Sequence, residues 1–130
     1  MRLKLSNFFS KGNTAMIKKY EDFKSEIRKN MRDGNGEILI SHILNPAEDL
    51  KAAVRLFAKL TIEKGCSIGY HEHINEEEVF YILKGTAELD DNGTKKILHA
   101  GDVAVTSNAG HSITNTGDEI CEVLAVILKF

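Results

Sequence analysis

The chain has 130 residues, 42% of them hydrophobic and 28% charged, which fits one globular domain with a single core. The formal net charge of −2 leaves no basic field for phosphates, so we expect no nucleic-acid partner. Cys66 and Cys121 are too few and too far apart for a disulfide-stapled secreted scaffold. No apolar run suits a signal peptide or a membrane span, and we therefore expect a cytoplasmic protein with no membrane partner.

The first predicted element is an amphipathic helix over residues 16–29. Four apolar side chains recur there at three- and four-residue steps: Ile17, Tyr20, Phe23 and Ile27. This spacing places them on one helical face, which we expect to cover a sheet rather than bind a partner. Glycines at 34 and 36 break the pattern. We therefore assign residues 1–36 to an N-terminal arm and helix, and residues 37–130 to a β-domain.

The rest of the chain predicts an all-β fold. Residues 37–44 are rich in strand formers, Asn45-Pro46 ends them, and residues 47–53 suit a short helical turn. Residues 54–62 alternate between apolar and polar positions, as a half-buried strand does. Further short strands are expected at residues 86–89, 94–98, 102–106, 111–115 and 120–128. Asn92-Gly93 predicts a tight hairpin, and short strands with regular turns favour an antiparallel sandwich or small barrel.

One stretch between Gly65 and Gly85 carries metal-ligand chemistry. His71 and His73 are two residues apart, so in a strand their side chains project from the same face. Of the three glutamates at 76–78, we choose Glu78, because it directly precedes the apolar run of the next strand. Residues 75–77 look like a solvated connection. Two imidazoles and one carboxylate favour iron, manganese, nickel or zinc over calcium or magnesium.

The spacing G-x5-H-x-H-x4-E-x6-G, read from Gly65 to Gly85, resembles the first motif of the cupins. The residues from Gly101 to Asn115 are similar to the second cupin motif, G-x5-P-x-G-x2-H-x3-N. Ser107 stands where the family usually has proline, and the turn before His111 is one residue shorter than usual. The resemblance implies that His111 is the last histidine ligand of the metal.

The resemblance also implies a fold and a range of functions. The expected architecture is the antiparallel double-stranded β-helix, or jelly-roll barrel, of a small single-domain cupin of bacterial type, and the expected assembly is a homodimer. Cupin activities include dioxygenation, decarboxylation, lyase chemistry and sugar isomerisation, and the sequence does not choose among them. A noncatalytic cupin that binds or senses a small molecule or sugar is the alternative. A structural cupin without metal would normally lack the ligands that this chain keeps.

Three neutral histidines and one carboxylate around one divalent ion leave a charge of about +1, which suits a small anionic or chelating ligand. An octahedral ion would keep about two open positions for it. Strand parity predicts the lining of the pocket: Phe80, Ile82, Ile113 and Asn115. Tyr70 and Tyr81 have the opposite parity and are expected outside.

Histidines without a spaced partner are weak candidates for metal ligands. His42 and His99 are of this kind, and we expect both to have structural roles. Arg55 and Lys59 lie on the polar face of the strand over residues 54–62. They could line the mouth of a pocket, but solvated positions are more typical of such residues.

Overall fold

The computed structural model describes residues 15–130, so the expected arm at residues 1–14 lies outside the described part. Three short helices and eight strands follow one another in this part. The helices are η1 (Tyr20–Asp22), η2 (Met31–Asp33) and α2 (Pro46–Asp49). The strands are β1 (Lys24–Lys29), β2 (Glu37–Leu44), β3 (Val54–Ile62), β4 (Ser67–Lys84), β5 (Thr86–Asp91), β6 (Thr94–His99), β7 (Val103–Thr114) and β8 (Cys121–Lys129).

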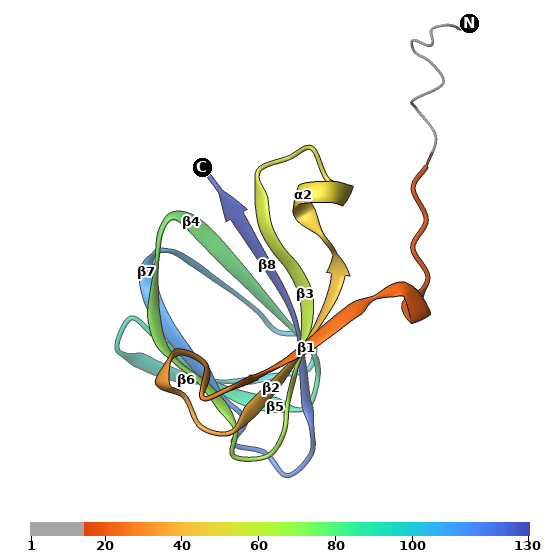
Figure 1. Cartoon of the computed structure of the whole chain (residues 1–130). Helices are drawn as coiled ribbons and strands as arrows, with labels where there is room; N and C mark the ends of the chain where they lie inside the picture. Colours follow the sequence, from red (N-terminus) through yellow and green to blue (C-terminus); the bar gives the residue numbers. More distant parts are fainter. Residues whose placement is uncertain (1–14) are drawn as a thin grey trace, which may run out of the picture.

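All eight strands belong to one antiparallel sheet with the order β1-β2-β3-β8-β4-β7-β5-β6. Figure 1 shows the strands curving around a common interior. The long strand β4 pairs with β7 on one side and β8 on the other, so it runs through the middle of the sheet. The expected all-β jelly-roll architecture is confirmed. No helix among residues 15–130 is long and apolar enough to cross a membrane.

The core is made by the inward-facing side chains of alternating strands. In β8 every second residue from Cys121 to Ile127 is buried, and in β3 the same holds for Ala58, Leu60 and Ile62. The predicted alternation over residues 54–62 is therefore confirmed, with β3 covering those nine residues. The Asn92-Gly93 hairpin is confirmed too, because both residues have positive φ, as a two-residue turn between twisted strands requires.

The predicted N-terminal helix is wrong. Residues 24–29 form the edge strand β1, and between residues 15 and 23 only the single turn η1 precedes it. The three-residue spacing of apolar side chains did not mark a buried face, since Ile27 is 61% exposed and Tyr20 is 76% exposed. β2 instead offers a row of backbone partners, and Lys29 pairs with Glu37 across the two strands. The sheet therefore begins before residue 37.

Candidate metal centre

Two irregularities in paired strands bring the site together. In β4 three residues, 74–76, lie opposite the single residue Asn108 of β7, which makes a β-bulge. Asn75 and Asn108 both have left-handed backbone conformations, and the Asn75 N–H donates to the Asn108 side-chain oxygen at 2.8 Å. The bulge reverses the parity of β4. His73 before it and Glu78 after it therefore face the same interior, although their numbers differ by five.

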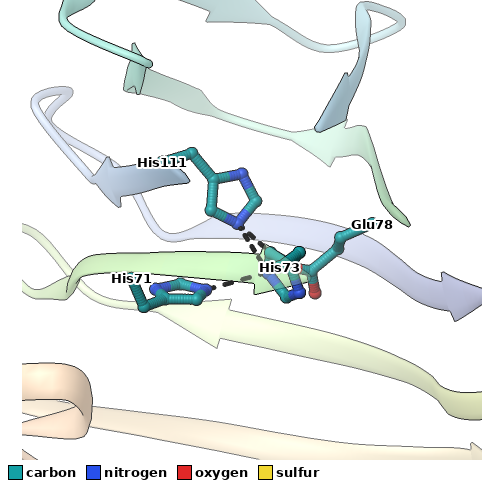
Figure 2. Close-up of side chains that lie close together, drawn as sticks. All are labelled: His71, His73, Glu78 and His111. Carbon is teal, nitrogen blue, oxygen red and sulfur yellow. Dashed lines mark hydrogen bonds and ion pairs between the residues drawn. The ribbon is translucent and has the colours of Figure 1, made fainter. Parts of the chain in front are cut away.

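Four side chains meet in the barrel, and we call them the histidine–glutamate cluster: His71, His73, Glu78 and His111. Their candidate ligand atoms all lie within 4.8 Å of one another. Figure 2 shows them pointing toward a common centre, from β4 and from β7. The Oε1 atom of Glu78 lies 2.9 Å from His73 Nε2 and 3.0 Å from His111 Nε2, and the three rings pack edge to face.

The shortened second motif does not misdirect His111. β7 runs continuously through the motif, and the bulge at Asn108 replaces the expected turn. His111 is fully buried, and Phe80 stacks on its imidazole with ring centroids 4.8 Å apart and planes 3° apart. The irregular backbone at Asn108, within β7, therefore takes the place of the longer turn of the usual motif.

Each histidine of the cluster is held by a different outer partner. His71 Nδ1–H donates to the Gly69 carbonyl at 2.7 Å, and His73 Nδ1–H donates to the Glu76 carboxylate at 2.6 Å. His111 Nδ1 hydrogen-bonds to the Thr106 hydroxyl at 2.7 Å. Because the first two acceptors have no proton to give, Nδ1 of these rings carries a proton and Nε2 faces the centre, where loss of its own proton leaves a lone pair for a metal ion. This is the tautomer that a metal ion needs.

The charges of the cluster are coupled. Burial raises the pKa of Glu78, but protonated Nε2 atoms of His111 and His73 at hydrogen-bonding distance, together with His71 Nε2 at 3.9 Å, outweigh burial and hold the pKa of Glu78 well below its usual value. The hydrogen bond to Glu78 raises the pKa of His73, against the opposing effect of burial, and Glu76 adds to the increase. Without an ion, protons thus hold this site together, and metal binding would displace them.

Arg55 supports the contact between Glu76 and His73 from the far side of Glu76. Glu76 accepts two hydrogen bonds from the guanidinium of Arg55, at 2.9 and 2.7 Å. The hydrogen bonds from Arg55 and then from His73 outweigh burial and lower the pKa of Glu76 to about 2. Glu76 is therefore ionised at neutral pH. The expectation of a solvated connection over residues 75–77 is wrong for Glu76, because the bulge turns its side chain inward.

A cavity of about 190 Å³ opens beside the cluster. His71, His73, Glu78 and the predicted Phe80 line it. Three other side chains expected in the pocket, Ile82, Ile113 and Asn115, are buried but do not line this cavity. Strand parity predicted that these side chains face the interior of the barrel. It could not predict whether they lie beside the cavity or elsewhere in the core. Asn115 instead donates to the backbone carbonyls of Ile62 and Glu119, which ties the connection between β7 and β8 to the end of β3.

The cavity also has a basic wall that the sequence did not reveal. Its members are Arg28, Arg32, His42 and Arg55. We expected a structural role for His42, but it lines the cavity, where its Nε2 lies 2.6 Å from Glu26. Arg55, for which a solvated position was the main expectation and the mouth of a pocket the alternative, also lines it. These residues come from β1, η2, β2 and β3, so no local spacing could have linked them to the metal motif.

The remaining predictions concern residues away from the cavity. Tyr70 and Tyr81 are 48% and 40% exposed, on the outer surface as expected. His99 lies at the end of β6 and is exposed. Cys66 and Cys121 are both free thiols, and Cys121 is fully buried.

The donor set fits one transition-metal ion. Three imidazoles with inward Nε2 atoms and one carboxylate at their centre suit manganese, iron, nickel or zinc, whereas an oxygen-only set would suit calcium or magnesium. All four groups project from the rigid paired strands β4 and β7, with outer hydrogen bonds that fix each ring.

Comparison with known proteins gives the same family. The cupin domain model matches residues 58–127. The chain is 40% identical over 119 residues to the oxalate-binding protein of Thermotoga maritima, covering 91% of this chain and 98% of that protein.

Solved structures agree with this assignment. A crystal structure of a predicted oxalate decarboxylase from Thermotoga maritima has a TM-score of 0.82 and 39% identity, covering 88% of this chain and 100% of that one. The cupin domain of Schizosaccharomyces pombe Cnp3 shares only the fold, with a TM-score of 0.65, 13% identity, and coverage of 81% and 69%. The barrel, the two motifs and these matches lead to one conclusion: the chain belongs to the cupin family.

Proposed function

We propose that this cupin binds one divalent transition-metal ion in the histidine–glutamate cluster and, at an open position of that ion, one carboxylate of a small dicarboxylate of the oxalate type. The observation that carries the proposal is the convergence of four buried ligand groups within 4.8 Å beside a cavity. A divalent ion held there supplies a Lewis acid that attracts carboxylate oxygens.

The cavity suits a small anion. Its volume of about 190 Å³ leaves room for a few heavy atoms. Three arginines line it, while Glu78 is the only carboxylate in its lining among the described residues. The name of the oxalate-binding relative supports the same ligand class. Phe80 and the neighbouring aliphatic side chains would exclude water and strengthen the attraction between the ligand and its charged partners.

Calorimetric titration of manganese-loaded protein with sodium oxalate tests the proposal. We expect saturable binding at one site per chain, and no binding by protein stripped of metal with a chelator. His71→Ala should behave like the stripped protein. Equal binding with and without metal, or no binding by the loaded protein, would contradict the proposal.

Turnover is the second candidate, because His42 places a proton-carrying group in the cavity. In a decarboxylation the carbon–carbon bond of oxalate breaks, one half leaves as carbon dioxide, and the other carbon takes a proton and becomes formate. Formate measured after incubation with metal-loaded protein tests this. Formate production that His42→Gln abolishes would favour turnover, and oxalate recovered unchanged would favour binding alone.

A further inference from the structure

Three arginines line the cavity, and two of them are already engaged by carboxylates. Arg28 Nε donates to Glu26 at 3.0 Å, and Arg55 makes its two-pronged contact with Glu76. Arg32 differs: within residues 15–130 its guanidinium makes no hydrogen bond or ion pair. Residues 1–14 contain no aspartate or glutamate, so no carboxylate of that segment can pair with it.

Arg32 is held over the cavity by an unusually close backbone contact. It lies in η2 with φ of 54°, a left-handed conformation that is costly for an arginine. η2 packs against the start of β4 at Gly69, where an added Cβ would lie 1.9 Å from the Arg32 carbonyl oxygen. Only glycine permits this approach. The segment that carries Arg32 is therefore fixed against β4.

The same glycine connects Arg32 to the cluster. The Gly69 carbonyl accepts the Nδ1–H of His71, so one residue sets both the orientation of a metal ligand and the position of η2. Arg32 and His71 line the same cavity. A ligand in this cavity would therefore have both the cluster and the Arg32 side chain in the wall around it.

We propose that Arg32 determines specificity for dianionic ligands by binding the carboxylate that does not coordinate the metal. This rests on the proposed metal-dependent binding of a dicarboxylate. Arginine suits the task, because its planar fork of N–H donors matches a carboxylate and stays charged at every physiological pH. The charges of Arg28 and Arg55 are already balanced by Glu26 and Glu76, to which each gives its Nε and Nη2 donors, whereas all five N–H donors of Arg32 are free of partners among the described residues.

The test is calorimetry of manganese-loaded Arg32→Gln with oxalate and with acetate. We expect the Kd for oxalate to rise tenfold or more, roughly 1.4 kcal/mol, while the Kd for acetate changes less than about twofold, because acetate has no second carboxylate. Lys96→Gln is the matched control: it removes one positive charge from the exposed strand β6, outside the cavity, and should change the oxalate Kd by less than about threefold. Metal content and thermal unfolding are measured on every variant.

A second variant keeps the test decisive if Arg32→Gln folds poorly. Arg32→Gly removes the side chain and relieves the left-handed conformation, so it should unfold at the same or a higher temperature and still lose oxalate affinity.

Each outcome has one meaning. Unchanged oxalate affinity in an Arg32 variant, or equal losses for oxalate and acetate, would overturn the role of Arg32 and leave the proposed function standing. Failure of the wild-type protein to bind oxalate would instead overturn the proposed function, and the role of Arg32 with it.

Discussion

The carboxylate of Glu76 lies 2.6 Å from Nδ1 of His73, on the side of the ring that faces away from the cluster. A carboxylate in this position fixes the tautomer of a metal-binding histidine and makes its other nitrogen more basic. Arg55 in turn fixes Glu76 from the other side. A chain of hydrogen bonds thus leads from the cavity wall to the candidate metal ligand, through a residue that coordinates nothing.

Removing this support should weaken metal binding without removing a ligand. For Glu76→Gln we expect the affinity for manganese or zinc to fall about 10- to 100-fold, the usual cost of losing an outer partner of a ligand. Competition titration with a chromophoric chelator measures it. Glu77→Gln is the matched control, since Glu77 makes no side-chain hydrogen bond or ion pair within residues 15–130, and its affinity should stay within about threefold of wild type. Equal losses in both variants would count against the role of Glu76.

The same contact predicts a dependence of stability on acid. The pKa of Glu76 in the folded chain is lowered from 4.5 to about 2, so the unfolded chain takes up this proton at a higher pH. The contribution of Glu76 to the free energy of unfolding is therefore fully present above pH 4.5 and lost as the pH falls toward 2. Urea unfolding of metal-free protein should show a shallower loss of stability for Glu76→Gln over this range. Parallel curves for variant and wild type would exclude the contribution.

Removing a ligand should abolish stoichiometric metal binding. Protein purified without a metal-affinity tag is expected to hold about one transition-metal ion per chain, and His71→Ala well below that, because three ligands bind more weakly than four. Elemental analysis by mass spectrometry measures the content and identifies the ion. His99→Ala, at an exposed site on β6, should keep the wild-type content. A metal content that survives His71→Ala would mean that the ion binds elsewhere.

Gly69 should not tolerate a side chain. For Gly69→Ala the added Cβ would meet the Arg32 carbonyl oxygen at 1.9 Å, so η2 must move away from β4. We expect unfolding to become easier by about 1–3 kcal/mol, as for other overpacked sites, and oxalate affinity to fall together with it. Chemical denaturation and calorimetry measure the two effects. Wild-type values in both would show that η2 can shift at no cost.

The homodimer implied by family resemblance remains a prediction. The outer face of the sheet carries exposed apolar side chains that could form the contact between two chains. Tyr81, Val103 and Val105 are 40%, 59% and 56% exposed on the neighbouring strands β4 and β7, and exposed apolar groups of this kind are typical of interfaces. Light scattering coupled to size exclusion should give the mass of two chains, and of one chain for Val105→Glu. Lys96→Glu on β6 is the control. A single-chain mass for the wild type would contradict the dimer.

Local sequence was enough for much of the fold and for three of the four candidate ligands. Alternation over residues 54–62, the Asn92-Gly93 turn and the glycine-framed spacing of His71 and His73 all reflect forces between residues near in sequence. Glu78 could be chosen for the same reason, since it directly precedes an apolar run. The prediction of an N-terminal helix failed because backbone pairing between β1 and β2 outweighed the helical spacing of the apolar side chains.

Tertiary structure alone decided how the site is supported and what surrounds it. The paired bulges at Asn75 and Asn108 reversed strand parity, turned Glu76 toward His73 and kept His111 aimed inward despite its shortened motif. The basic wall joins residues from four elements, and Arg32 reaches it only because η2 docks on Gly69. The sequence by itself determined which candidate ligands the chain carries: His71 and His73 by their spacing within a strand, Glu78 by the apolar run that follows it, and His111 by family resemblance. Which charges face that metal depends on strands that meet only in the folded chain.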